Sequence, residues 1–206
     1  MNVLLINGSP HAHGCTDAAL QEIAKALNAD GIETTIYHIG AVPVGGCVGC
    51  GGCSKAGKCV FGGPVADVLP LVEKADGIVF GAPVHYATAA ASMLGFMHRL
   101  AISGGKYLRH KPAAVVTSAR RAGTTTALEA MEKVPQFFEM PLISSTYWPM
   151  VHGGKAEEVF SDEEGLQIMR NLGRNMAWML RCIEAGKAAG IAAPVAENDK
   201  RTNFIR

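Results

Sequence analysis

The sequence lacks an excess of charge of either sign. Lysine and arginine number 19, aspartate and glutamate 18, and the 206 residues carry a formal net charge of +1. Binding to nucleic acid or to an anionic membrane depends on a strongly basic surface, so we expect neither as a partner. Hydrophobic residues make up 49% of the chain and charged residues 18%. This composition predicts one folded domain over residues 1–206, with a Cys-rich insertion loop at about 40–64.

The sequence also lacks a long apolar run. No segment approaches the ~18 apolar residues that a membrane-spanning helix needs. Met1 leads directly into the apolar residues 3–6, without the basic region of a secretory signal. We therefore expect a cytoplasmic protein. In a reducing compartment, the six cysteines are better explained as ligands or redox groups than as disulfides.

Internal repeats and long linkers are absent as well, and short apolar segments alternate with amphipathic ones. This alternation predicts an α/β fold with a doubly wound parallel sheet of five strands and helices on both faces. Ser161, with Glu164 three residues later, is predicted to cap the last helix, and Cys182 is predicted to be buried in it. The predicted strands are 3–6, 32–39, 77–80, 113–117 and 142–146; the predicted helices are 16–28, 65–74, 88–100, 124–139 and 161–187.

In a doubly wound sheet the binding site lies outside the carboxyl ends of the strands. Loops 7–16, 81–87 and 118–124 follow predicted strands, so we expect them to form this site. The first loop is neither the phosphate loop of nucleotide hydrolases nor a dinucleotide-binding turn. It offers hydroxyls at Ser9 and Thr16 before a helix start, which is typical of a site for a single phosphate. The alternative is an ordinary turn capped by Thr16.

The other two loops suggest a flat ligand. Residues 81–86 form an apolar bend against which a heterocycle could lie; alternatively, His85 faces solvent and Tyr86 caps the core. The loop 118–124 carries hydroxyls, a glycine and two cations. Arg120 and Arg121 could meet the edge of a flavin or a phosphorylated second substrate, or one of them is an ordinary solvated or ion-paired arginine.

Four cysteines lie within thirteen residues, in the pattern C-x2-C-x2-C-x5-C. Three closely spaced thiolates and a trailing fourth are typical of a [4Fe–4S] ligand set, whereas structural zinc sites usually contain two separated cysteine pairs. Glycines between the cysteines allow the backbone to wrap around a small cluster. Zinc, or a redox-active or inert loop, remains an alternative. The candidate ligands are Cys47, Cys50, Cys53 and Cys59.

Taken together, these motifs resemble a known family. G-S-P-x-x-x-G-x-T after the first strand, G-x-P-V-x-Y after the third and the Arg-Gly-Thr loop after the fourth resemble the NADPH-dependent FMN reductases of the flavodoxin-like superfamily. The cysteine motif is similar to that of the iron–sulfur flavoprotein subgroup, as are the final residues 201–206. The resemblance implies a flavodoxin-like sheet of order 2-1-3-4-5, bound FMN, NAD(P)H as electron donor, a possible [4Fe–4S] cluster, and a homodimer or homotetramer.

The resemblance also implies positions for the cofactor. It places Ser9, His11, Gly14, Cys15 and Thr16 around the FMN phosphate, and Pro83, Val84, His85 and Tyr86 along the isoalloxazine. Ser118, Ala119, Arg120, Arg121 and Gly123 would lie near its pyrimidine end. The sequence departs from the family at His11, where a permanent cation is common, at Cys15, where asparagine or serine is usual, and at His85-Tyr86, which replaces two aromatic residues.

Flavin carries the chemistry in such proteins, so no catalytic residue is assigned. Tyr86 and Arg120 are candidates for steering the second substrate, and the electron acceptor is a small molecule or a protein. Two other function classes compete. A flavodoxin-type electron carrier usually has strong negative charge, which this chain lacks. A non-enzymatic zinc or redox-sensor module could use the four cysteines.

Overall fold

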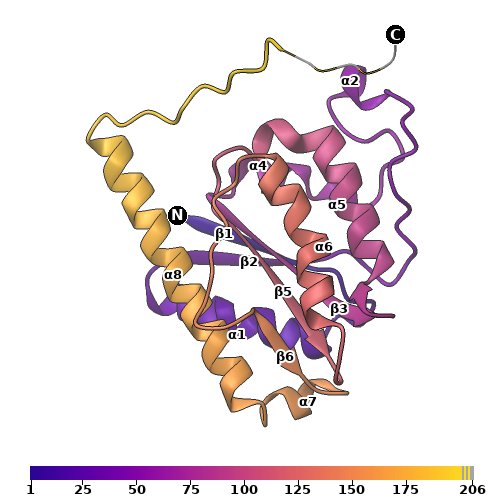
Figure 1. Cartoon of the computed structure of the whole chain (residues 1–206), viewed down its shortest axis with the longest axis vertical. Helices are drawn as coiled ribbons and strands as arrows, with labels where there is room; N and C mark the ends of the chain where they lie inside the picture. Colours follow the sequence, from indigo (N-terminus) through magenta and orange to yellow (C-terminus); the bar gives the residue numbers. More distant parts are fainter. Residues whose placement is uncertain (201, 203, 205–206) are drawn as a thin grey trace.

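The computed structural model describes residues 1–200, 202 and 204, and its centre is a parallel sheet (Figure 1). The tail at 201–206 that supported the resemblance therefore lies largely outside the described residues. Five strands run parallel, in the spatial order β2-β1-β3-β5-β6, and β4 pairs antiparallel with β3. This confirms the predicted fold class and the order 2-1-3-4-5 of the parallel strands. Their bounds are β1 Asn2–Asn7, β2 Glu33–His38, β3 Gly77–His85, β4 Thr88–Ala89, β5 Ala113–Ala119 and β6 Met150–His152.

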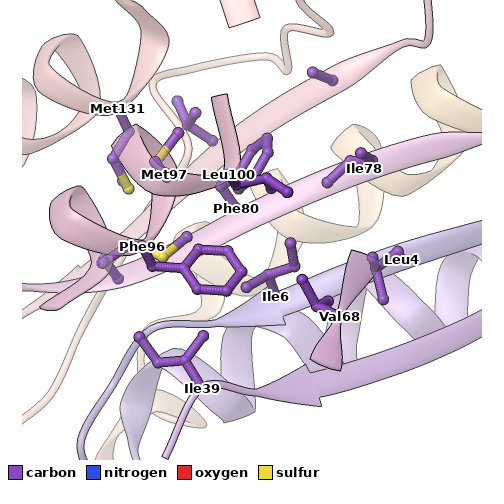
Figure 2. Close-up of a cluster of buried hydrophobic side chains, with 14 of the residues drawn as sticks. Leu4, Ile6, Ile39, Val68, Ile78, Phe80, Phe96, Met97, Leu100 and Met131 are labelled. Atoms are coloured by element: carbon purple, nitrogen blue, oxygen red, sulfur yellow. The ribbon is translucent and has the colours of Figure 1, made fainter. Parts of the chain in front are cut away.

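Helices cover both faces of the sheet, and the alternation of side chains along each strand explains why. Leu4 and Ile6 of β1 enter one buried cluster, with α5 and α6 (Figure 2). Val3 and Leu5 enter the other, with α1 and α8. The helices are α1 Cys15–Ala29, α2 Cys53–Ala56, α3 Pro64–Asp67, α4 Leu69–Lys74, α5 Ala91–Gly104, α6 Thr124–Phe137, α7 Ala156–Val159 and α8 Glu163–Ala188, with a 3-10 turn at Gly105–Tyr107.

The fifth parallel strand is not the predicted segment 142–146 but β6, Met150–His152. Leu142 forms a single bridge with Ala113, and the chain then turns toward α8. Ser145 Oγ donates to the carbonyl of Ile168 at 2.7 Å, and Asn175 Nδ2 donates to the carbonyl of Ser144 at 2.8 Å. These contacts hold 144–145 against the helix, so pairing with β5 resumes only at 150.

Two predicted helices differ from the observed ones: one is divided, and the other begins and ends later, as α5 Ala91–Gly104. The segment 65–74 splits into α3 and α4 at Val68, because Pro70 has no amide hydrogen to continue the helical ladder. The helix predicted at 88–100 begins only at Ala91, since Thr88 and Ala89 pair with β3 as β4.

Two predictions about the last helix are wrong. Asp162, not Ser161, caps α8, and its carboxylate accepts a hydrogen bond from the amide of Gly165 at 2.9 Å. Cys182 is exposed and not buried, because the buried stripe of α8 passes through Met176 and Leu180 on another side of the helix. Among the described residues, no helix is both long and apolar enough to cross a membrane.

Candidate functional site

A cavity of 590 Å³ opens at the carboxyl ends of the parallel strands, where the sheet topology predicts a binding site. We call it the strand-end cavity. Loops that follow β1, β3, β5 and β6 form its walls. Its lining consists of Ser9, Pro10, His11, His13, Gly14, Cys15, Thr16, Pro83, Val84, His85, Ser118, Ala119, Arg120, Gly153, Gly154, Lys155, Ala156 and Glu157.

The first loop is held in shape by a buried asparagine. Asn7, the last residue of β1, is fully buried. Its Oδ1 accepts from the amide of Ser9 at 3.0 Å, and its Nδ2 donates to the carbonyl of Ala12 at 3.1 Å. Ser9 Oγ in turn accepts from the amide of His11 at 3.1 Å. This chain of hydrogen bonds fixes the loop backbone, so Asn7 is a supporting residue that the sequence pattern did not reveal.

Helix α1 begins at the floor of the strand-end cavity. Gly14 is its N-cap and provides no side-chain cap, so the amide groups of the first turn have no partner within the helix. Such amides favour an anion. Thr16 is not the cap, because it lies second in the helix. Its Oγ1 is 2.8 Å from Ser118 Oγ, and both residues are buried. This hydroxyl pair ties the first loop to the third beneath the cavity.

Cys15 connects the first loop to the loop after β6. Its Sγ donates to the carbonyl of Gly153 at 3.3 Å. Burial raises the pKa of the Cys15 thiol; its backbone hydrogen bond opposes this, and the charges of Glu158 and Glu157 add to the rise. The thiol therefore stays protonated near neutral pH and acts as a donor. The loop 153–157 that it holds forms a wall that we did not predict.

The second loop is a tight hairpin between β3 and β4. Val84 pairs with Ala89 and His85 with Thr88, which leaves Tyr86 and Ala87 as the turn, with φ angles of 48° and 60°. Two non-glycine residues in the left-handed region are unusual, and such strain is concentrated at functional sites. Tyr86 is fully exposed, which excludes the core-capping alternative.

The structure brings together most, but not all, of the predicted residues. Tyr86, Arg121 and Gly123 are not among the residues that line the strand-end cavity. Gly123 instead supports the hairpin: a Cβ there would lie 2.6 Å from Ala87 Cα, and its φ is +91°. In the described part of the chain, neither Arg120 nor Arg121 forms an ion pair, so the cation of Arg120 at the cavity is available to a ligand.

The four motif cysteines line a second cavity, of 410 Å³, which we call the cysteine cavity. It lies between the cysteine loop and α5, on the side of the molecule where α2 is drawn in Figure 1. Arg99, Ile102 and Ser103 of α5 complete its wall, with Val60 and Phe61 from the loop. The amide of Gly49 donates to Cys47 Sγ at 3.4 Å, so the loop backbone already directs a donor at a motif sulfur.

The shape of the cysteine cavity bears on the kind of metal centre. Within the described residues, no three His, Cys, Asp or Glu side chains are placed to bind a single metal ion. A mononuclear zinc site requires four ligands around one ion. In an iron–sulfur cluster, by contrast, each cysteine binds its own iron, so the sulfurs stand further apart. Four thiols around one cavity therefore fit a cluster better than they fit zinc.

Comparison with known proteins identifies a family and several similar proteins. A family model described as NADPH-dependent FMN reductase matches residues 1–155. An iron–sulfur flavoprotein of Methanocaldococcus jannaschii is 29% identical over 192 residues, which cover 89% of this chain and 100% of the relative. An iron–sulfur flavoprotein of Archaeoglobus fulgidus is 33% identical over 126 residues, which cover 60% of this chain and 62% of the relative.

Solved structures show the same fold. A WrbA-like flavodoxin protein from Agrobacterium tumefaciens has a TM-score of 0.63 at 16% identity, covering 88% of this chain and 98% of that one. A flavodoxin from the domain Archaea has a TM-score of 0.61 at 15% identity, covering 88% and 99%. The chain therefore belongs to the NADPH-dependent FMN reductase family and is a flavin-dependent oxidoreductase.

Proposed function

We propose that this protein oxidises NAD(P)H through FMN bound in the strand-end cavity and passes the electrons on through a [4Fe–4S] cluster in the cysteine cavity. The observation that carries the first part is the floor of the strand-end cavity. There, the free first-turn amides of α1 meet the loops that follow four parallel strands, β1, β3, β5 and β6.

The residues present fit FMN. The first turn of α1 and Ser9 would bind the single phosphate, which needs no lysine. Pro83 and Val84 offer an apolar wall for a flat ring, beside the exposed imidazole of His85, and Ser118 to Arg120 offer backbone groups at its edge. When bound, FMN takes two electrons from a nicotinamide cofactor and returns them singly or in pairs.

The rim of the strand-end cavity fits a second, phosphorylated substrate. Arg120 and Lys155 are exposed cations that line the cavity from two different loops. Glu157 is the acidic side chain in this lining. We infer that the two cations attract the phosphates of NAD(P)H and orient the nicotinamide toward the hairpin of β3 and β4.

The cluster would be held by Cys47, Cys50, Cys53 and Cys59. The fit rests on the shared cavity and on donors already directed at sulfur, one from Gly49 and two from Arg99. A bound cluster supplies a one-electron step between the flavin and an acceptor, which is a small molecule or a protein. The protein's part is to fix the four sulfurs in a cavity that also holds Val60, Phe61 and Ile102.

Anaerobic purification tests both parts. Heat should release a chromophore with the mass of FMN, and analysis should find four irons and four sulfides for each chain. FAD, or no flavin at saturating supply, would contradict the first part. Oxidation of NADPH and NADH should then be followed separately, with ferricyanide as acceptor. If neither is oxidised by protein that holds FMN, the proposed donor is wrong.

The neighbouring arginines provide a matched pair for the donor. Arg120→Gln should raise the KM for NADPH about two- to fivefold with little change in kcat, because one exposed cation contributes a modest attraction. Arg121→Gln, which removes the same charge outside the cavity lining, should change KM much less. Equal effects would show that only overall charge matters.

A further inference from the structure

One face of helix α5 holds the cysteine loop. Gly95, Arg99, Ile102 and Ser103 follow the spacing at which side chains share a helix face. A Cβ at Gly95 would lie 2.4 Å from the carbonyl oxygen of Val44, so the loop backbone approaches the helix closely there. At the other end, Cys53 Sγ lies 3.9 Å from the carbonyl oxygen of Ile102.

Between these two contacts, Arg99 points at a sulfur. Its Nε and Nη2 donate to Cys59 Sγ at 3.3 and 3.2 Å, and Nη2 also donates to the carbonyl of Gly62 at 2.8 Å. The guanidinium thus joins the fourth cysteine to the turn that follows it. Both Arg99 and Cys59 are half-buried.

The pairing of Arg99 differs from that of other arginines in the chain. Arg109 bonds to the carboxylate of Glu139, and Arg170 to that of Glu22. Among the described residues, Arg99 forms no ion pair with a carboxylate. A neutral thiol is a weak hydrogen-bond acceptor, whereas a charged sulfur accepts strongly from a cation. Two guanidinium donors on one sulfur therefore fit a cysteine that binds a metal centre as a thiolate.

Cys59 also needs more support than the other three cysteines. Cys47, Cys50 and Cys53 are spaced three residues apart, but Cys59 follows α2 and a left-handed Gly57 with φ 70°. Gly62 and Gly63, just beyond it, also have positive φ. The backbone on both sides of Cys59 is thus a series of turns, which Arg99 braces from α5.

We propose that Arg99 is a positioning residue of the cysteine cavity. It keeps Cys59 Sγ in place as a ligand and, through two charge-assisted hydrogen bonds to that sulfur, raises the reduction potential of the cluster. Hydrogen bonds to ligand sulfur are among the factors that set such potentials, because they stabilise the more negative, reduced state. This inference rests on the proposed cluster and adds a residue outside the cysteine motif.

The test compares Arg99→Gln and Arg99→Lys with the wild type and with Arg174→Gln. Arg174 is an exposed arginine that bonds only to Asn171 among the described residues, so its variant controls for lost charge. Each protein is reconstituted anaerobically with ferrous iron and sulfide. The measurements are iron content, the midpoint potential by anaerobic dye titration, and the rate of iron release to a chelator.

Arg99→Gln should give a more negative potential and release iron at least about tenfold faster, as expected from the loss of a charge-assisted hydrogen bond. Arg99→Lys keeps the charge but not the paired donors. Its potential and its rate of iron release should therefore lie between those of Arg99→Gln and the wild type. Arg174→Gln should match the wild type. If Arg99→Gln loses its FMN, the variant is misfolded, and the same measurements on Arg99→Lys then decide whether Arg99 has the proposed role.

Two results would overturn the inference, and they differ. If the wild type takes up iron and sulfide while the decisive Arg99 variant keeps the wild-type potential and iron release, Arg99 has no such role and the cluster proposal stands. If the wild type binds no iron, the cluster proposal fails and the role of Arg99 fails with it.

Discussion

The strand-end cavity is built on the sheet, whereas the cysteine cavity is built on a single helix. The former rests on the ends of four parallel strands, with Asn7, Thr16 and Ser118 buried beneath it. The latter is enclosed by a glycine-rich loop whose Val48, Val60 and Phe61 are exposed. Ordering each loop residue costs about 1–2 kcal/mol, and few buried contacts in this loop offset that cost. The first cavity should therefore keep its shape without a ligand, while the second should depend on its cluster and on α5.

The largest effect is expected from a substitution that moves the cysteine loop away from α5. Gly95→Ala places a methyl group 2.4 Å from the carbonyl oxygen of Val44 and 3.0 Å from the carbonyl carbon of Gly45. Because neither backbone atom can give way without moving the loop, we expect the variant to lose most of its iron and to keep its FMN. Iron analysis and flavin absorbance after anaerobic reconstitution measure both.

Gly186→Ala in α8 is the matched control, since its new methyl group meets nothing closer than 3.9 Å. Exchanging glycine for alanine in a helix favours the folded state by about 0.5–1 kcal/mol, so this variant should keep its iron. If Gly95→Ala also keeps a full cluster, the close approach to α5 does not organise the loop.

The next largest effect is expected at the buried support of the other cavity. Asn7→Ala leaves the amide of Ser9 and the carbonyl of Ala12 without their partner. We expect a cost of about 2–3 kcal/mol in FMN binding, or roughly 30- to 150-fold in Kd. Titration of the FMN-free protein with FMN, followed by flavin fluorescence, measures it.

Asn28→Ala removes an exposed amide whose Oδ1 accepts from the hydroxyl of Thr34 at the far end of α1, and it should leave FMN affinity unchanged. The iron content of Asn7→Ala should also equal that of the wild type, because the two cavities are held by different elements. An Asn7→Ala variant with unaltered FMN affinity would show that the first loop does not set the binding site.

A smaller effect is expected at the hydroxyl pair. Thr16→Ala should weaken FMN binding by about 1–2 kcal/mol, because the hydrogen bond to Ser118 is lost. No helix cap is removed, since Gly14 is the N-cap of α1. Ser118→Ala should cost a similar amount. Since each change breaks the same bond, the double variant should cost much less than the sum of the two. Fully additive losses would show that the two hydroxyls act separately on the ligand.

The sequence predicted those parts of the strand-end cavity that are indicated by residues adjacent in the chain. Short apolar strands followed by glycine, serine and proline indicated the loops after β1, β3 and β5, and the structure brings them together. It did not predict the supporting role of Asn7, the first residue of the predicted loop 7–16, because that role comes from folded contacts with Ser9 and Ala12. Such a role depends on the path of the loop, which no periodicity reveals.

The loop 153–157 was missed for a different reason. The apolar residues at 142–146 resemble a strand, so the sequence predicts that the segment after 150 only connects this strand to the last helix. The structure moves the strand to Met150–His152 because Ser144 and Ser145 bond to α8. The loop that follows the true strand then forms a wall of the cavity. Two hydrogen bonds to α8 thus account for both a strand and a part of the site that differ from the prediction.

The smallest effect concerns thiol chemistry, which should also separate the two cavities. Cys47 and Cys50 are exposed in the cysteine loop, whereas Cys15 is half-buried in the strand-end cavity. Burial raises the pKa of the Cys15 thiol, and the thiolate is the form that reacts with iodoacetamide. In metal-free and FMN-free protein near neutral pH, Cys15 should therefore be alkylated more slowly than Cys47 or Cys50.

The sign of the pH dependence follows from the same shift. A raised pKa means that the thiolate of Cys15 forms only at more alkaline pH, so its alkylation should accelerate above the range in which an ordinary thiol already reacts. Cys182, exposed on α8, is the reference for an unhindered thiol, and mass mapping of labelled peptides follows each cysteine in one experiment. Adding FMN should slow Cys15 further and leave Cys182 unchanged, because only Cys15 lines the strand-end cavity. Equal protection of both thiols by FMN would mean that binding tightens the whole molecule, and protection of neither would place the phosphate outside the first loop.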